Sequence, residues 1–194
     1  SLPSSSCRST GGLARGTSLP AAYDAYLLGR FYWNKRTAAD MVRAADYFQQ
    51  AIRADSSYAQ AGTGLADSYV LFGPVEYAEP GINQDSILTL AERAARRAVA
   101  LAPQLGEPHS SLGEMLEHHW KWDEAGEAFR QGIALSPRYA TGHQWYAYHL
   151  QIRNRWDEGI REMERARELD PLSLVIVVSL AVAYDGADRA PDAE

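Results

Sequence analysis

Residues 122–137, WDEAGEAFRQGIALSP, return 34 residues later as residues 156–171, WDEGIREMERARELDP. Both copies open on Trp-Asp-Glu and end on a proline, and a bulky residue, Phe129 or Met163, holds the same place in each. Small and apolar residues recur inside both copies at the spacing of one helix face. These coincidences at one period indicate an internal repeat. Its unit contains a helix that stops before a proline, because proline cannot continue a helix interior.

The same period extends on both sides of this stretch. Pro103, Pro137 and Pro171 are 34 residues apart. Two degenerate copies lie upstream, and the longer one spans 47 residues from Ser56 to Pro103, which is the period plus an insertion of 13. The insertion falls within residues 71–87, where Gly-Pro and Pro-Gly pairs mark turns.

Each unit is predicted to fold as two antiparallel helices. The first helix carries a small residue where its partner crosses closely: Gly29, Ala66, Gly113, Ala147 and Ala181. We expect first helices over residues 21–34, 59–72, 106–118, 140–153 and 174–186. We expect second helices over residues 40–54, 84–102, 123–135 and 157–169.

Stacking such pairs buries a core that no single pair can bury, so the expected fold is an all-α, right-handed superhelical solenoid. It would hold about 4.5 units after a disordered head over residues 1–20. The expected repeats of the domain 21–194 are 22–58, 59–105, 106–139, 140–173 and a partial unit, 174–194.

This pattern resembles the tetratricopeptide repeat (TPR) family, over about residues 21–194 and most strongly over 106–171. The positions that match the family signature are Gly113, Ala125, Phe129, Pro137 and Ala147. The chain departs from the signature early in the first helices, where the family often has a tryptophan and this chain has Gly62, His109 and His143.

A narrower resemblance lies in residues 25–37, AYLLGRFYWNKRT, and in the shorter runs 64–69 and 143–147. These runs are similar to TPR modules of large bacterial regulatory proteins. In such proteins a winged-helix DNA-binding domain, a nucleotide cyclase or a Ser/Thr kinase precedes the repeats. The resemblance implies a scaffold or sensor module for signalling and does not identify the effector.

The composition excludes several classes of protein. The net charge of −6 argues against a nucleic-acid-binding segment, which normally has a basic face. A single cysteine, Cys7, rules out an intrachain disulfide, and the most apolar run, residues 172–184, is too short to span a membrane. No initiator methionine or signal peptide opens the sequence, so we expect a segment of a longer, cytoplasmic protein.

First helices line the concave side of such a solenoid, so their solvent-facing stripes predict a peptide-binding groove. The groove residues that we predict are Tyr23, Tyr26, Arg30, Trp33, Asp67, Glu114, Glu117 and Tyr148. The acidic centre favours a protein or peptide partner with lysine or arginine. The alternative, left open here, is that the stripe is only a solvated face.

The last predicted helix, over 174–186, is apolar nearly all round and therefore expects cover on more than one side. Either the segment is truncated before the partner of this helix, or its apolar surface forms a homodimer contact through Val175, Val178 and Val182. The function alternative to a peptide-binding scaffold is thus a homo-oligomerisation or assembly module of a larger regulatory protein.

No enzymatic activity, cofactor or metal site is expected. The sequence contains no nucleophile elbow, phosphate loop or His-Glu-X-X-His motif. Five histidines lie between His109 and His149, but the equivalent His109 and His143 are expected to pack between helices, and no cysteine supports a zinc site. The pairs Asp123-Glu124 and Asp157-Glu158 open second helices, where the helix dipole favours negative charge.

Overall fold

The structure is a computed structural model that describes residues 16–72 and 84–189. These ranges contain nine α-helices and no strand. The helices are α2 (Pro20–Trp33), α3 (Ala38–Ala54), α4 (Ala59–Phe72), α5 (Gln84–Leu101), α6 (Gly106–His118), α7 (Trp122–Leu135), α8 (Ala140–Ile152), α9 (Trp156–Leu169) and α10 (Leu174–Arg189). All predicted helices are present, and each boundary lies within three residues of its predicted position. The all-α fold class is therefore confirmed.

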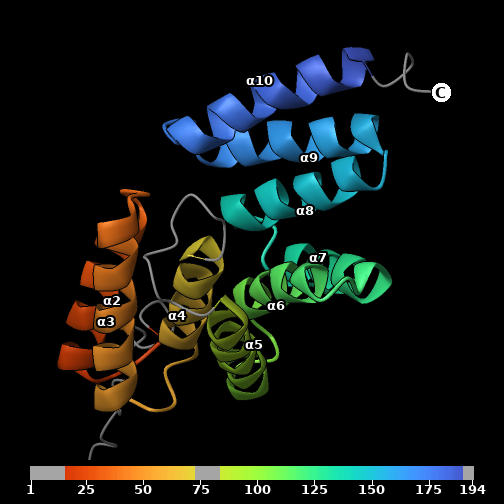
Figure 1. Ribbon diagram of the computed structural model, residues 1–194. Coiled ribbons are helices and arrows are strands. Elements are labelled where there is room, and N and C mark those ends of the chain that lie inside the picture. The colour runs from red at the N-terminus through yellow and green to blue at the C-terminus, as the bar shows by residue number, and fades with distance from the viewer. Residues whose placement is uncertain (1–15, 73–83, 190–194) are drawn as a thin grey trace, which may run out of the picture.

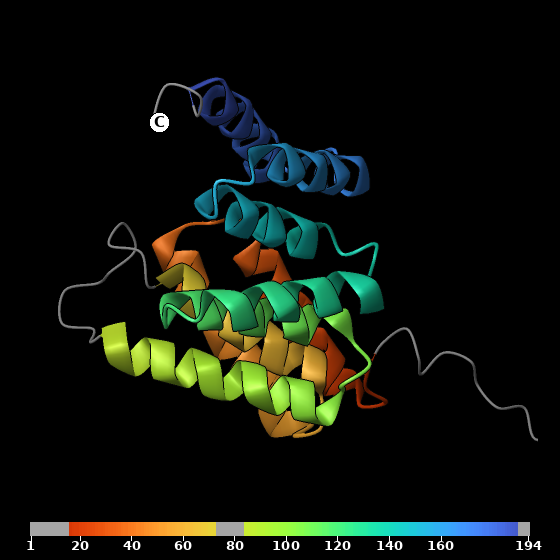
Figure 2. The same ribbon diagram turned by 90° about the vertical axis from the view of Figure 1, so that its right-hand side faces the viewer.

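The helices stack as antiparallel pairs into a curved solenoid. α2 packs on α3, α4 on α5, α6 on α7 and α8 on α9, and α10 packs on α9. The first helices also touch one another in series, since α4 contacts α2 and α6, and α6 contacts α8. Figure 1 shows the pairs following a curved path from α2 and α3 to α9 and α10, and Figure 2 shows the same stack turned.

Small residues let the two helices of a pair cross closely. Gly29 and Gly113 lie against the rings of Phe48 and Phe129, and a Cβ added at Gly113 would come within 2.8 Å of the Phe129 ring. Ala66 and Ala147 are fully buried at their crossings. Ala181, the fifth residue of this set, is exposed because no described helix packs on that face of α10.

Residues 16–20, which belong to the predicted head, contact the first unit. Pro20 starts α2, and Thr17 is buried. The Thr17 hydroxyl donates a hydrogen bond to Asp55 Oδ2 over 2.5 Å, which ties this segment to the end of α3. Thr17 and Pro20 are thus part of the folded unit. Residues 1–15, including Cys7, and residues 73–83 of the predicted insertion lie outside the described residues.

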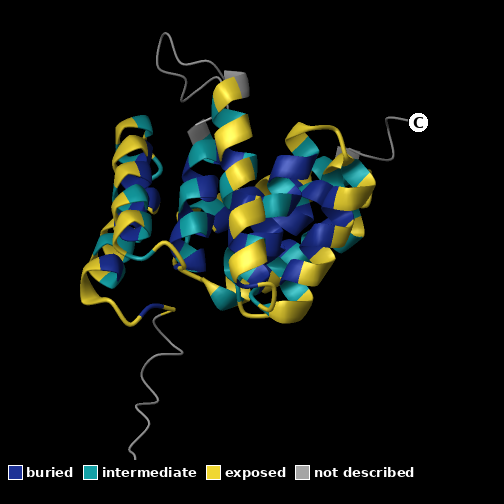
Figure 3. Cartoon of the chain, turned by 90° about the horizontal axis from the view of Figure 1, so that it is seen from below, coloured by how far each residue is buried: buried dark blue, intermediate teal, exposed yellow. Residues whose placement is uncertain are grey.

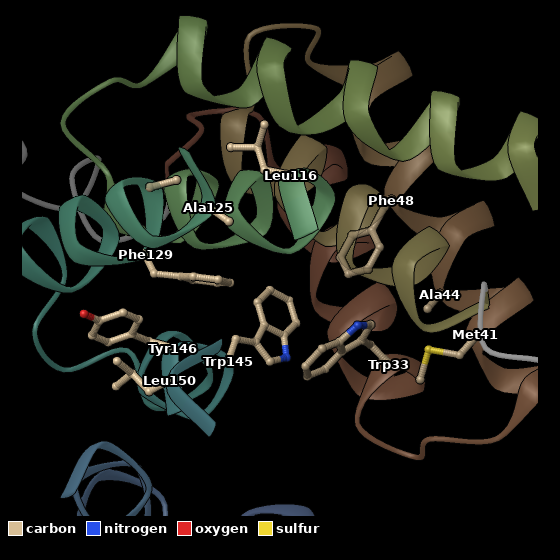
Figure 4. Close-up of a cluster of buried hydrophobic side chains, with 11 residues drawn as sticks. Trp33, Met41, Ala44, Phe48, Leu116, Ala125, Phe129, Trp145, Tyr146 and Leu150 are labelled. Atoms are coloured by element: carbon tan, nitrogen blue, oxygen red, sulfur yellow. The ribbon is translucent and has the colours of Figure 1, made fainter. Parts of the chain in front are cut away.

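The largest buried cluster joins helices that are distant in the sequence. Trp33, at the end of α2, belongs to the same core cluster as Trp145 and Tyr146 of α8 and Phe129 of α7. Figure 4 shows the indoles of Trp33 and Trp145 next to each other. The solenoid therefore curves enough for its first and fourth units to meet. Figure 3 shows buried residues running through the stack, with exposed residues on its outer surfaces.

Candidate functional site

The predicted groove residues fall into two groups in the structure. The first group lies on α2 and α4, inside the curve of the solenoid, and comprises Tyr23, Tyr26, Arg30, Trp33 and Asp67. The second group lies on α6 and α8, where Glu114, Glu117 and Tyr148 line one open pocket. The second group lines an open hollow, whereas Trp33 and Asp67 of the first group are packed into the fold.

Asp67 lies at the centre of a buried polar contact. Its side chain has no exposed surface, and Ser111 Oγ donates a hydrogen bond to Oδ1 over 2.5 Å. Arg30 Nη1 lies 3.9 Å from Oδ2. Burial raises the pKa of Asp67 to about 6, although the Ser111 hydrogen bond and the Arg30 charge act to lower it. This carboxyl links α2, α4 and α6 and is not presented to a ligand.

Trp33 is one of the predicted groove residues, and the structure places it in the core with only 2% of its surface exposed. The Arg30 and Arg36 guanidinium groups lie over its ring, at 4.4 and 3.6 Å from the ring centre. The expectation that this indole faces solvent is therefore not met. Its burial follows from the contact between α2 and α8, where Trp145 covers it.

Tyr23 and Tyr26 are half-buried on α2. The Tyr26 ring packs against Phe48 and Tyr58, with ring centres 5.9 and 5.2 Å apart. Burial raises the pKa of the Tyr26 hydroxyl. These contacts give Tyr26 a packing role at the interface between the first two units.

The second group of residues belongs to what we call the acidic-aromatic pocket. It has two adjoining lobes that share Glu114, Glu117 and Ile152. Tyr148 and Trp156 line one lobe, of about 500 Å³, and Trp120 and Trp122 line the other, of about 290 Å³. The larger lobe is within the range of about 300–1,000 Å³ that is typical of ligand sites, and the smaller lobe is at the lower end of this range.

The two glutamates of this pocket differ in their surroundings. Glu117 Oε1 lies 2.5 Å from Nδ1 of His149, and both side chains are largely buried. Glu114 forms no ion pair with any described residue. Burial, together with the negative charges of Glu117 and Asp67, raises the pKa of Glu114 to about 8. The pocket thus holds a carboxyl group that lacks a cation.

Trp120 has an unusual backbone conformation for so large a residue. Its φ of 61° lies in the left-handed region, which costs a non-glycine residue about 1–2 kcal/mol and which asparagine tolerates best. The equivalent residue one period later is Asn154, with a φ of 58°. Trp120 is also 78% exposed, and its ring meets the edge of Trp122. A strained and exposed tryptophan beside an unpaired acid is a feature that packing alone does not explain.

Sequence reasoning missed Trp120, and it did not place Trp122 and Trp156 in a binding site. Trp122 and Trp156 begin α7 and α9, as the period suggests, but both also line the pocket. One signal in the sequence could have identified Trp120. The turn between paired helices has asparagine at position 154, and the same position of the preceding unit carries a tryptophan.

The predicted dimer residues lie on α10. Val178 and Val182 are 53% and 62% exposed, and Val175 is half-buried. Leu174 and Val177 extend this exposed apolar face. The opposite face, with Ile176 and Leu180, packs on α8 and α9.

His109 and His143 are buried, as expected, and so is His149. His109 and His143 each contact a backbone carbonyl oxygen of the turn before their own helix, and His149 pairs with Glu117. Within the described ranges, no group of three or more histidine, cysteine, aspartate or glutamate side chains could hold a metal ion. No helix there is long and apolar enough to cross a membrane.

Comparison with known proteins identifies the fold. TTC0263, a TPR protein of Thermus thermophilus, superimposes with a TM-score of 0.67 and 19% identity, over 86% of this chain and 83% of the other. PilF of Pseudomonas aeruginosa superimposes with a TM-score of 0.56 and 17% identity, over 89% and 74% of the two chains. No protein-family model matches the sequence, and no curated protein matches it. The chain therefore has a TPR-like fold.

Proposed function

We propose that this chain, with its TPR-like fold, is a non-catalytic protein-interaction module that binds a basic segment of a partner protein in the acidic-aromatic pocket. The observation that carries the proposal is the exposed Trp120 beside the unpaired Glu114. The binding residues would be Glu114, Glu117 and Tyr148, joined by Trp120 and Trp122. The scaffold role, the signalling context and the cytoplasmic location are likewise predictions from the sequence.

The pocket has the chemistry that a lysine or arginine side chain requires. A cation in the pocket would lie near two carboxyl groups, and partial burial would strengthen the attraction between the cation and these groups. Tryptophan rings bind cations on their faces, and this contact contributes about 0.5–2 kcal/mol. Ile152 offers an apolar surface to the methylene stem of such a side chain.

Glu114 is the group whose state a cation would change. With its pKa raised to about 8, this carboxyl is mostly protonated at pH 7 in the free protein. A bound ammonium or guanidinium group favours the ionised form, so binding should release a proton. The cost of burying the carboxylate, which the free protein avoids by protonation, would then be offset by the ligand charge.

The proposal is tested by fluorescence anisotropy with a labelled peptide of about 12 residues that carries arginine among leucines and alanines. The parent protein should bind this peptide, and the same peptide with glutamate in place of arginine should not bind. Glu114→Gln should weaken binding by roughly tenfold or more, as expected for a desolvated charge pair. Glu127→Gln is the matched control, because Glu127 is an exposed glutamate on α7. Equal loss in both variants, or equal binding of both peptides, would contradict the proposal.

A second candidate function is homo-assembly through α10. The observation that favours it is the exposed apolar face with Val178 and Val182. Sedimentation of the parent should then show a dimer, and the double substitution of Val178→Glu and Val182→Glu should give a monomer that still binds the arginine peptide. A parent that is monomeric at high concentration would exclude this assembly.

A further inference from the structure

The second unit lacks a side chain that the next two units have. His109 Nε2 lies 2.9 Å from the carbonyl oxygen of Pro103, and His143 Nε2 lies 3.1 Å from that of Pro137. Gly62 occupies the equivalent position in α4. The equivalent carbonyl oxygen, that of Ser56, accepts a hydrogen bond from Arg97 Nη2 of α5 over 3.1 Å. The carbonyl group is satisfied, and no imidazole fills the space above Gly62.

A groove lies at this position, and we call it the Gly62 groove. It has a volume of about 210 Å³ between α3, α4 and α5. Its apolar lining residues are Ile52, Leu65, Leu90 and Leu101. A Cβ added at Gly62 would have its nearest neighbour, Ala98 Cβ, 3.4 Å away, which is an ordinary contact. Gly62 thus leaves a space that a histidine side chain occupies in each of the next two units.

The wall of the groove that α5 forms also lacks a polar side chain that a later unit has. In the fourth unit, Glu162 of α9 pairs with His143, with its Oε2 2.7 Å from Nδ1. The residue two periods earlier is Ala94, which lines the groove and offers no polar group. The second unit therefore has neither the histidine nor the glutamate of this contact. The wall of the groove is therefore apolar at this point.

Two arginines give this apolar groove a positive edge. Arg93 and Arg97 of α5 both line it and are both exposed. Neither forms an ion pair with any described residue. In a chain whose net charge is −6, this edge has the opposite sign to the protein as a whole. Charge complementarity therefore points to an acidic occupant.

The volume decides between a small molecule and a side chain. Sites for drug-sized ligands have volumes of about 300–1,000 Å³, and the Gly62 groove is smaller. We propose that the Gly62 groove is a second binding site, which takes a bulky apolar side chain of a partner segment while a neighbouring carboxylate of that segment pairs with Arg93 and Arg97. This site differs in chemistry and in position from the acidic-aromatic pocket, and it does not depend on the function proposed for that pocket.

The test uses a phage-displayed library of random peptides of about 12 residues. Selection is carried out on the full chain with Trp120→Asn, so that the acidic-aromatic pocket does not dominate the result. The enriched peptides should share a leucine or aromatic residue next to aspartate or glutamate. Their affinity for Gly62→His should be lower by roughly tenfold or more, because the imidazole fills the groove. Enrichment of no such peptides, or equal binding to Gly62→His, would overturn the proposal.

A charge exchange keeps the test decisive even if Gly62→His does not fold. Arg93→Glu changes an exposed residue and should leave the melting temperature unchanged. This variant should lose the acidic peptides by roughly tenfold and should bind versions in which lysine replaces the acidic residue. Binding of the acidic peptides that is unaffected by Arg93→Glu would show that they bind elsewhere, and it would overturn the proposal.

Discussion

Asp67 shows how one buried carboxyl can make stability depend on pH. Its pKa in the folded protein is about 6, against 3.8 for an ordinary aspartate. Between these two values the folded state holds a proton that the unfolded state has lost. The free energy of unfolding therefore falls as the pH rises through this window and then levels off. Above this window the buried carboxylate lowers the free energy of unfolding, although Ser111 and Arg30 contact it between three helices.

We predict that Asp67→Asn removes this part of the pH dependence. The amide oxygen of asparagine can still accept the Ser111 hydrogen bond, and the amide does not ionise between pH 4 and pH 7. From pH 4 to pH 7 the parent should lose about 3 kcal/mol relative to the variant, at about 1.4 kcal/mol for each pKa unit. Urea unfolding of both proteins at several pH values measures the difference. A difference that stays constant over this range would contradict the prediction.

Trp120 allows strain and binding to be separated. Trp120→Asn places the residue that favours a left-handed conformation at a φ of 61°. The relief of strain should balance the lost edge contact with Trp122, so the free energy of unfolding should change by less than about 1 kcal/mol. Binding of the arginine peptide should nevertheless be lost. Thermal unfolding and anisotropy on the same sample measure both, and a variant that is strongly destabilised would show that Trp120 is structural.

At the scale of elements, the sequence was sufficient for the helices and their pairing. The 34-residue interval places the ends of helices at Pro103, Pro137 and Pro171, and small residues such as Gly113 mark the crossings. These signals are local in the sequence, so a single sequence is enough to recognise them. Ala181 has the same signal and is exposed, because a crossing also needs a partner helix and none is described there.

Two glycines in first helices provide a matched test of these crossings. At Gly62 there is room for a methyl group, so Gly62→Ala should stabilise the protein by about 0.5–1 kcal/mol through helix propensity. At Gly113 the added Cβ would lie 2.8 Å from the Phe129 ring, so Gly113→Ala should destabilise it by about 1–3 kcal/mol. Chemical unfolding of the two variants measures this contrast. Effects of the same sign would contradict the account of the crossings.

At the scale of the whole molecule, the curvature of the solenoid decides which predicted site residues are accessible. Trp33 and Asp67 lie on the expected stripe, but the approach of α8 to α2 buries Trp33, and Ser111 of α6 reaches Asp67. A stripe on one helix does not encode how tightly four units curve. Glu114 and Tyr148 lie on neighbouring first helices, so their meeting in one pocket needed only local geometry.

The contact between the first and fourth units makes Trp33 a sensitive position. Its indole N–H is buried and forms no hydrogen bond with the described residues. Trp33→Phe should therefore cost less than Trp33→Ala, because it removes an unsatisfied polar group while it keeps most of the packing. We expect a loss of about 3–5 kcal/mol for Trp33→Ala and a loss well below that for Trp33→Phe. Equal losses in urea unfolding would show that the phenyl ring of Trp33→Phe restores no packing, and this would contradict the prediction.

The most direct measurement is a titration of the tryptophan indole N–H signals by NMR with the arginine peptide. The chain has five tryptophans, of which Trp120, Trp122 and Trp156 line the acidic-aromatic pocket, while Trp33 and Trp145 are buried in the core. Single tryptophan-to-phenylalanine variants assign the signals. We predict that the three pocket signals shift with one common dissociation constant and that the two core signals do not move. An absence of shifts up to about 1 mM peptide, or shifts confined to Trp33 and Trp145, would contradict binding in this pocket.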